Sequence, residues 1–477
     1  MKTNQGDFAY EHSLDHALEF FSKAGSIYDT DKRRFYDNDE DILSLFQRVW
    51  IVDSLIAFKL LMWVRDCRGG AGNRSGFRKC LKWLGNNAPE WVKSNIELIP
   101  EMGRFDDLRS LFGTRSEHVA VQHWMASLLN GDVLAAKWAK RTDIPLYLEY
   151  KESFPSSNVG NFRRFLANMR KEHIVEHKMC ENRWNEVEYS KVPSVAMARY
   201  TNAFNKRDVD RFEAYKELLE KGEETVHAGV LFPHDCVRTA QNGDVKIADA
   251  QFDALPNYID TDDRIITIAD TSGSMGIDVS GSVTACDVSQ ALALYCSAKM
   301  DKDSPFYKKF IAFCSEGKFV NWDGMKFSDA VNNHGIFDGA VGSTRIDKAL
   351  NLILETAEFF KLDDSQMPTM LLICSDMQFT EATEEDQWGY RSIEVPAETM
   401  VEQSLKGWDN AGYKRPKIVY WNLVPYGGQP DTVDSKDIAL VSGFSPSILK
   451  AILACDDFSP RAIMMETLKK YENVVKP

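Results

Sequence analysis

Apolar residues in the first half of the chain recur at intervals of three and four, the spacing that is typical of amphipathic helices. One such series contains Ile42, Leu45, Phe46 and Val49, and similar series continue to about residue 219. Short polar breaks, for example 69–73, separate them. The pattern predicts several helices joined by tight turns, either as a bundle or as a helical repeat. No repeat of fixed period is present, so periodicity alone leaves both architectures open.

The pattern changes at about residue 255, where short runs rich in β-branched residues begin to alternate with helical stretches. Four predicted strands cover 264–269, 309–314, 369–375 and 417–423. A helix is predicted over 344–360, and Ser-Pro pairs at 445–446 and 459–460 predict the starts of two more. Strands alternating with helices favour a parallel sheet covered on both faces.

These patterns predict the fold class α + α/β, with a helical part followed by a doubly wound, Rossmann-like domain. We place the helical module at 1–240, a polar connector at 241–258 and the α/β domain at 259–477. A chain of 477 residues is too long for one hydrophobic core, which agrees with more than one domain.

Charge is distributed unevenly between the two halves. The whole chain has 57 Lys and Arg against 71 Asp and Glu, a net charge of −14 that argues against a nucleic-acid binder. Residues 1–240 contain 35 of each sign, whereas residues 241–477 contain 22 cations and 36 anions. The whole deficit therefore lies in the second half, and nucleic-acid binding stays open for the first.

Composition also bounds the compartment and the class of protein. A share of 44% hydrophobic residues excludes bulk disorder, and no apolar stretch is long enough to span a bilayer. The start of the chain lacks the pattern of a signal peptide. The nine cysteines form no C-x-x-C pair and several lie in apolar runs, which is typical of reduced thiols. We therefore expect a cytoplasmic protein, in the host cytoplasm if it is viral, that does not contact membranes.

The most specific chemical pattern follows the first predicted strand, in the sequence Asp270-Thr271-Ser272-Gly273-Ser274. It offers one carboxylate and alternating hydroxyls at the carboxyl end of a strand, where α/β sheets bind ligands. Thr344 at the start of a helix and Asp376 after a later strand offer further oxygen ligands. An all-oxygen set with few carboxylates suits Mg²⁺ (or Mn²⁺) rather than zinc.

These three segments resemble the metal-ion-dependent adhesion site of von Willebrand factor A domains, and the resemblance extends over about 260–477. It implies that Ser272, Ser274 and Thr344 supply hydroxyl ligands, and that Asp270 and Asp376 act directly or through water. It also implies a sixth position open to an Asp or Glu of a protein partner. Two alternatives are a simple turn with a helix N-cap and an Asp-based phosphotransfer loop, which would need a second Asp where Ser272 stands.

The first half is similar to the TROVE module of Ro autoantigens. The resemblance rests on segments 63–66, 68–74, 103–108, 136–138 and 192–194, with further matches at 199–212. A TROVE-like module joined to an A domain looks like an uncharacterised Ro-like family of viruses, bacteria and plants, in which 375–379 and 441–445 also look familiar. The resemblance implies a HEAT-like ring or horseshoe of helix pairs that holds small structured or misfolded RNA.

Local clusters of cations could provide the phosphate contacts that such binding requires, and they give no reason to expect DNA specificity. The residues concerned are Arg65, Arg68, Arg74, Arg78, Lys79, Lys82, Lys137, Arg163, Arg164, Arg170 and Lys171. The alternative is that these arginines only pair with Asp66, Asp106 and Asp107 between helices, and we give it equal weight.

Two further patterns are interpreted as structural. The sequence His173-Ile174-Val175-Glu176-His177 matches the inverted zinc-protease motif, but cations surround it and no third ligand is evident. Aromatic residues such as Trp184 and Phe204 could stack on bases, but at helical spacing they are more typical of a core.

We therefore predict a non-enzymatic, RNA-binding, Ro-like ribonucleoprotein component whose A domain binds Mg²⁺ and recruits a partner carboxylate. The alternative is a protein–protein scaffold, for example a virion or host-interaction protein, that uses the metal site without RNA. A hydrolase ranks third, because no general base is evident near Asp270.

Overall fold

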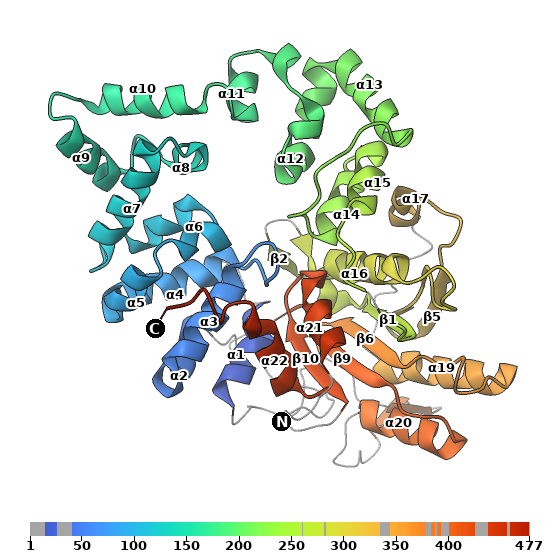
Figure 1. Ribbon diagram of the computed structural model, residues 1–477. Helices are drawn as coiled ribbons and strands as arrows, with labels where there is room; N and C mark the ends of the chain where they lie inside the picture. The colour runs from blue at the N-terminus through green and yellow to red at the C-terminus, as the bar shows by residue number, and fades with distance from the viewer. Residues whose placement is uncertain are drawn as a thin grey trace. The chain divides into compact units, whose positions relative to one another are not determined.

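The computed structural model describes residues 15–25, 41–259, 261–280, 283–333, 344–377, 379, 383–386, 389–392, 400–424, 437–455 and 458–476 (Figure 1). The chain divides into two compact units. The helical unit contains Trp50–Val230 and Lys470–Pro477, and the sheet unit contains Met1–Val49 and Leu231–Lys469. Each unit thus combines a long central segment with a segment from one end of the chain.

The helical unit is built from helices that pack mainly on near neighbours in the sequence, such as α3 on α4 and α12 on α13. Its helices are α2 (Ile42–Val52, which begins in the other unit), α3 (Ser54–Arg65), α4 (Arg74–Asn87), α5 (Pro89–Ser94), α6 (Leu98–Met102), η1 (Phe105–Leu111), α7 (Glu117–Leu129), α8 (Val133–Trp138), α9 (Ile144–Ser153), α10 (Val159–Arg170), α11 (Val175–Cys180), η2 (Trp184–Glu186), η3 (Tyr189–Lys191), α12 (Ser194–Arg207) and α13 (Val209–Glu220). Asp53 and Asn73 cap α3 and α4, and Trp63 and Trp124 are buried in the core.

The last residues of the chain complete the helical unit. The buried carboxylate of Asp66 accepts hydrogen bonds from Lys470 Nζ at 2.5 Å and from the Tyr471 hydroxyl at 2.9 Å. Asn95 bonds both the backbone N–H and the carbonyl of Lys476. Residues more than 370 positions apart in the sequence are therefore joined in one core.

The sheet unit contains a six-stranded sheet in the order β10-β9-β6-β1-β4-β5. Its strands are β1 (Ile265–Asp270), β4 (Lys309–Phe313), β5 (Gly317–Asn321), β6 (Met370–Ser375), β9 (Lys417–Asn422) and β10 (Ile438–Ser442). All neighbours are parallel except β4 and β5. Two ribbons, β2 (Asp278–Ser280) with β3 (Val283–Thr284) and β7 (Thr383–Asp386) with β8 (Gly389–Ser392), lie outside it.

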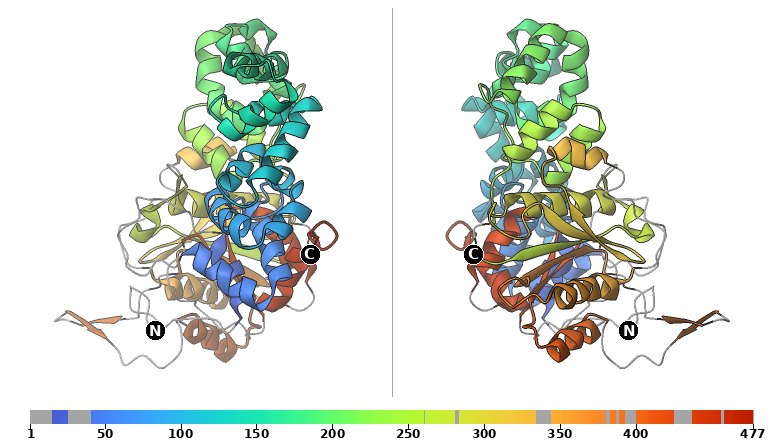
Figure 2. Two further views of the ribbon diagram at one scale, coloured as in Figure 1. Left: turned by 90° about the vertical axis from the view of Figure 1, so that its left-hand side faces the viewer. Right: turned by 90° about the vertical axis from the view of Figure 1, so that its right-hand side faces the viewer.

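Helices cover both faces of this sheet (Figures 1 and 2). On one face α16 (Ala285–Lys299) packs against β1, β4 and β6. On the other, α19 (Ile346–Phe360) and α20 (Met400–Ala411) bury a core that includes Leu350 and Trp408. The remaining helices of the unit are α1 (His16–Ala24), α14 (Pro233–Gln241), α15 (Val245–Asp253), η4 (Gly273–Gly276), α17 (Phe327–Asn332), η5 (Pro446–Ile448), α21 (Leu449–Ala454) and α22 (Pro460–Lys469).

The predicted class, helices followed by an α/β sheet, is confirmed at this level. All four predicted strands exist with ends shifted by one residue, and among the described residues no strand precedes Ile265. The edge strands β5 and β10 were not predicted. β5 is short and mostly exposed, so it lacks a continuous apolar run.

The two compact units do not follow the predicted domain boundaries. The supposed connector 241–258 contains α15, capped by Asp244, and α14 and α15 pack together within the sheet unit. At the other end, α1 packs on β10, where Gly25 N–H donates to Ser442 Oγ at 3.0 Å. A Cβ at Gly25 would lie 2.6 Å from the Ser442 carbonyl oxygen, so this contact requires glycine. Helical periodicity cannot show which unit a helix packs on, and this accounts for the difference.

Candidate metal centre and arginine cluster

The loop after β1 carries the first half of the candidate metal centre. Asp270 ends β1 and is fully buried, and its Oδ1 accepts the backbone N–H of Ser272 at 2.9 Å. The Ser272 and Ser274 hydroxyls lie 3.1 Å apart. Thr271 anchors the loop to the neighbouring strand, because its N–H and its hydroxyl both donate to the Phe313 carbonyl. The loop therefore presents two hydroxyls beside one buried carboxylate.

The end of β6 brings the second carboxylate. In the parallel register Ala269 pairs with Cys374, so Ser375 lies opposite Asp270 and donates its hydroxyl to Asp270 Oδ2 at 2.5 Å. Asp376 follows and is fully buried. Met377 then adopts a left-handed conformation (φ 61°), and its N–H donates to Ser375 Oγ at 3.1 Å. Such a conformation is costly for a residue other than glycine, and its presence at this turn is typical of functional loops.

Thr344 reaches the same edge of the sheet from the start of α19. The next residue, Arg345, donates its backbone N–H to the Cys314 carbonyl at 2.9 Å, and Cys314 directly follows β4. Because Phe313 pairs with Asp270, this bond brings Thr344 to the carboxyl end of the strand beside β1. The Thr344 side chain is buried. Gly342 and Ser343, which precede it, lie outside the described residues.

The strand order explains why these segments meet. β1 and β6 are adjacent at the centre of the sheet, and the chain proceeds from β1 toward β4 on one side and from β6 toward β9 on the other. This reversal is the topological switch point at which open α/β sheets bind ligands. Asp270 and Asp376 are the residues at the carboxyl ends of these two strands.

The charge of the centre favours a cation. Burial, together with the nearby carboxylate of Asp376, raises the pKa of Asp270 to about 7. Two buried carboxylates repel each other unless a proton or a cation compensates one of them. The surrounding donors are hydroxyl and carboxylate oxygens, a set that suits Mg²⁺. Among the described residues no group of three or more His, Cys, Asp or Glu side chains could hold a metal, so a thiolate or imidazole site is not found there.

The sequence did not identify Ser375 or Thr271 as part of the centre. Ser375 fixes the Asp270 carboxylate, and Thr271 ties the loop to β4. The signals for Ser375 are its position directly before Asp376 at the end of a buried strand and its place in the segment 375–379 of the Ro-like resemblance.

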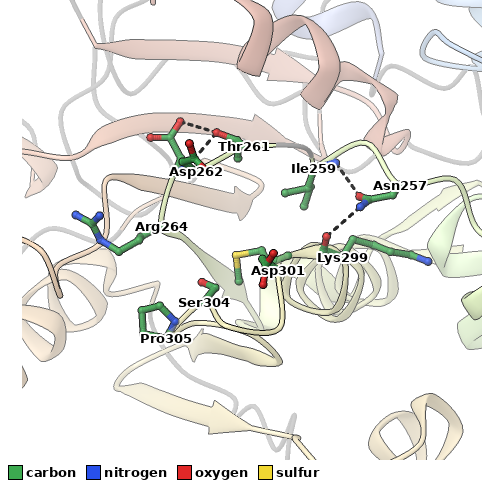
Figure 3. A pocket seen from close by; sticks show the side chains of 11 residues that line it. Asn257, Ile259, Thr261, Asp262, Arg264, Lys299, Asp301, Ser304 and Pro305 are labelled. Carbon is green, nitrogen blue, oxygen red and sulfur yellow. Dashed lines mark hydrogen bonds between the residues drawn. The ribbon is translucent and has the colours of Figure 1, made fainter.

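A cavity of about 590 Å³ lies at the opposite end of β1, near the last turn of α16 (Figure 3). Its charged lining includes Asp262, Arg264 and Asp301. Arg264 is committed to local structure, because it donates to the Met367 and Asp364 carbonyls. The cavity is thus separate from the candidate metal centre.

Several cations predicted to bind RNA instead make contacts within the helical unit. Arg65 is buried and pairs with Asp107, and Arg78 pairs with both Asp106 and Asp107. Lys137 pairs with Glu176 at 3.0 Å, and Arg170 donates to the carbonyls of Ala136 and Ala139. Arg65 and Arg78 therefore pair with aspartates between helices, as the alternative interpretation of the sequence stated.

The other predicted cations are more accessible. Arg68 donates to the Glu101 carbonyl, and Lys79 is half-buried. The exposed members are Arg68, Arg74, Lys82, Arg163, Arg164 and Lys171. Asp66, expected to pair with arginine, pairs with Lys470 instead. In the zinc-protease-like motif, His177 Nδ1 lies 3.5 Å from Glu181.

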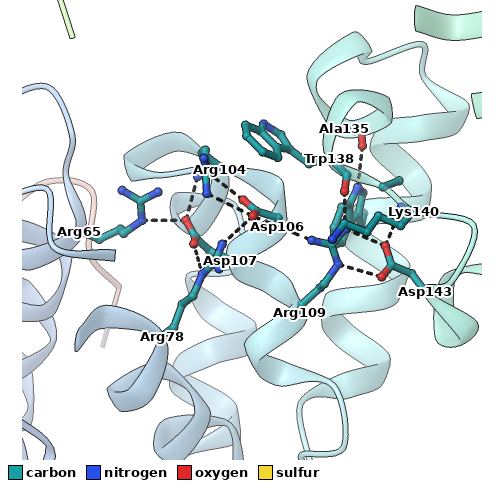
Figure 4. A network of polar contacts seen from close by, with 12 residues as sticks. Arg65, Arg78, Arg104, Asp106, Asp107, Arg109, Ala135, Trp138, Lys140 and Asp143 are labelled. Carbon is teal, nitrogen blue, oxygen red and sulfur yellow. Dashed lines mark hydrogen bonds and ion pairs between the residues drawn. The ribbon is translucent and has the colours of Figure 1, made fainter. Parts of the chain in front are cut away.

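Sequence reasoning missed Arg104, Arg109 and Trp138, which join Arg65 and Arg78 in one polar network (Figure 4). Arg109 holds Asp143 through two hydrogen bonds of 2.8 and 2.9 Å. The guanidinium of Arg104 lies 4.0 Å from the centre of the Trp138 ring. The only signals in the sequence were that Arg104 and Trp138 lie inside segments that resemble the TROVE module.

None of the helices among the described residues has both the length and the apolar character needed to cross a membrane.

Comparison with known proteins finds matches to two family models, and both families have unknown functions. Residues 264–476 match a domain of unknown function (DUF7788), and 3–112 and 158–268 match another (DUF2828). The chain is also similar to the uncharacterized protein L728 of Acanthamoeba polyphaga mimivirus, with 23% identity over 530 residues that cover 98% of this chain and 87% of the relative. The first match contains every residue of the candidate metal centre.

Proposed function

We propose that the sheet unit is a von Willebrand factor A-like domain that binds Mg²⁺, or Mn²⁺, at the carboxyl edge of its sheet. The observation that supports this most strongly is the convergence of Asp270, Asp376 and Thr344 at the switch point between β1 and β6. These residues come from segments about 30 to 70 positions apart, so a local turn does not explain their arrangement.

In this proposal the hydroxyls of Ser272, Ser274 and Thr344 bind the ion, and Asp270 and Asp376 contact it directly or through water. The ion would supply a positive charge that accepts a further carboxylate, from an Asp or Glu of a protein partner. We propose a binding role rather than catalysis, because the Ser272 hydroxyl pairs with the Ser274 hydroxyl and not with a base.

A calorimetric titration tests the metal proposal. We expect one Mg²⁺ per chain for the wild type and no measurable heat for Asp270→Asn, which keeps the shape of the side chain and removes its charge. Asp262→Asn is the matched control, because Asp262 is exposed at the other end of β1. Equal titrations of wild type and Asp270→Asn would exclude this site.

We further propose that the helical unit is a HEAT-like, Ro-like module that binds small structured or misfolded RNA in the cytoplasm. The supporting observation is its set of exposed cations, in a half of the chain with no net negative charge. The acidic second half disfavours phosphate on its own surface.

The alternative is a protein–protein scaffold without RNA, and one observation favours it. Arg65, Lys137 and Arg170 are engaged inside the helical unit, which leaves fewer cations for phosphate. The ratio of absorbance at 260 and 280 nm of protein purified from cells separates the two. Co-purifying RNA supports RNA binding, whereas RNA-free protein with a partner that is lost on Asp376→Ala supports the scaffold.

A further inference from the structure

The arginine cluster of the helical unit contains more positive charge than its internal pairs neutralise. We define it as the side chains of Arg65, Arg74, Arg78, Arg104 and Arg109 with those of Asp106, Asp107 and Asp143. They come from α3, α4, η1 and the segments before η1 and α9, and Figure 4 labels all of them except Arg74.

Every carboxylate in the cluster already has arginine partners. Asp107 accepts Arg65 Nε at 2.7 Å and Arg78 Nε at 2.6 Å. Asp106 pairs with Arg78 at 2.8 Å and with Arg104 at 3.0 Å, and Asp143 is held by Arg109. Because a guanidinium has five N–H donors, these pairs leave donors unused on the arginine side.

The surplus is two positive charges, from five guanidinium groups and three carboxylates. Arg74, the first residue of α4, is exposed and makes no ion pair with any described residue. Partial burial, with Arg74 nearby, lowers the pKa of Arg104 to about 10. Burial is the larger cause of this lowered pKa, and the positive charge of Arg74 adds to it.

The charges are layered so that the surplus faces solvent. The Asp107 and Asp106 side chains are 0% and 10% exposed, whereas those of Arg78 and Arg104 are 31% and 26% exposed. The carboxylates thus lie beneath the guanidinium groups and hold them in place, and the solvent-exposed side of the cluster presents N–H donors.

Trp138, on α8, limits the movement of the Arg104 side chain on the same face of the cluster. Its half-buried ring lies 4.0 Å from the Arg104 guanidinium, which fixes the plane of that group. Guanidinium groups that ion pairs and the Trp138 ring already hold in place lose little side-chain entropy when they bind a ligand.

We propose that Arg74, Arg78 and Arg104 together bind a phosphate group of the RNA backbone, with Asp106, Asp107 and Trp138 as positioning residues. Guanidinium groups match phosphate with paired N–H bonds, and a phosphodiester supplies the negative charge that the cluster lacks. This inference rests on the proposed RNA binding. The proposed phosphate contact includes Arg104, which sequence analysis did not select, and leaves out Arg65, which is buried.

An RNA-binding measurement with matched charge reversals tests the site. Arg74→Glu removes no ion pair, so the unit should fold, and we expect about tenfold weaker binding of a single-stranded RNA at constant salt. Arg199→Glu, an equal change at an exposed arginine on α12, is the control and should change affinity less than twofold. The plot of log K against log salt has a negative slope. For Arg74→Gln this slope should become less steep by about 0.7, which corresponds to the loss of one phosphate contact. Equal effects of Arg74→Glu and Arg199→Glu would overturn the inference.

A second arm separates this inference from the proposed function. Inorganic phosphate should raise the melting temperature of wild type and Arg199→Glu but not of Arg74→Glu. If the wild type binds no RNA while this phosphate effect holds, RNA binding fails and the cluster stands as a site for free phosphate groups. If phosphate also leaves the wild type unchanged, both proposals are overturned.

Discussion

At the residue scale, Asp270 would make the proposed metal binding dependent on pH. Its pKa is raised to about 7 by burial and by Asp376, whereas an unfolded Asp titrates near 4. Between about pH 4 and 7 the folded state holds a proton that the unfolded state has released, so without metal the free energy of unfolding falls as pH rises through this window.

Mg²⁺ must displace that proton. We expect 10 mM Mg²⁺ to raise the melting temperature more at pH 8 than at pH 5.5, and Asp270→Asn to show neither effect; equal shifts at both pH values would refute this assignment.

The hydroxyl of Tyr471 gives a second prediction at this scale. It donates to the buried Asp66 carboxylate, which Lys470 also contacts. Although burial acts to raise it, these partners hold the pKa of Asp66 below its usual value. Tyr471→Phe should lower the free energy of unfolding of the helical unit by about 1–2 kcal/mol in urea denaturation. Tyr307→Phe, on a less buried tyrosine of the sheet unit, is the control and should have little effect.

At this scale the sequence predicted the carboxylates of the metal centre but not their supports. Asp270 and Asp376 could be found because each follows a buried apolar run. The Ser375–Asp270 hydrogen bond joins residues 105 positions apart, and the partners of Asp107 lie 29 and 42 positions away. Hydrophobic periodicity carries no information on such pairs, so buried Arg65 and exposed Arg74 looked equivalent.

At the scale of elements, the last residues of the chain act as part of the helical core. Deleting 470–477 removes Tyr471, which is fully buried, and leaves the Asp66 carboxylate without Lys470. We expect the helical unit to lose about 3–5 kcal/mol, the usual cost of removing a large buried aromatic side chain from a core. Hydrogen exchange should quicken in α3 and α5 and stay unchanged in β1 and β6. Exchange that is unaltered in α3 would contradict the contact.

Elements with strong local patterns were predicted well, and elements defined by distant partners were not. The central strands have continuous apolar runs, and Ser459 and Pro460 begin α22 as expected. In contrast, α1 packs in one unit with residues that follow it by about 200 positions or more, and the residues after Lys469 belong to a different unit from the residues just before them. Their placement depends on contacts such as Gly25 with Ser442, which a helical pattern cannot show.

At the scale of the whole molecule, the separation of charge and chemistry assigns a distinct proposed role to each unit. The acidic half carries the buried carboxylate pair, and the neutral half carries the surplus of guanidinium charge. We expect RNA affinity to fall steeply with salt and to be unaffected by Asp270→Asn, as measured by fluorescence anisotropy. A loss of RNA binding on Asp270→Asn in a correctly folded protein would contradict this division.

Anomalous X-ray scattering from crystals grown with Mn²⁺ is the decisive test of the proposed metal centre. We expect one strong manganese peak per chain at the carboxyl edge of the sheet, beside Asp270 and Asp376, that is absent in Asp270→Asn. A crystal with bound manganese elsewhere and none beside these two carboxylates would contradict it.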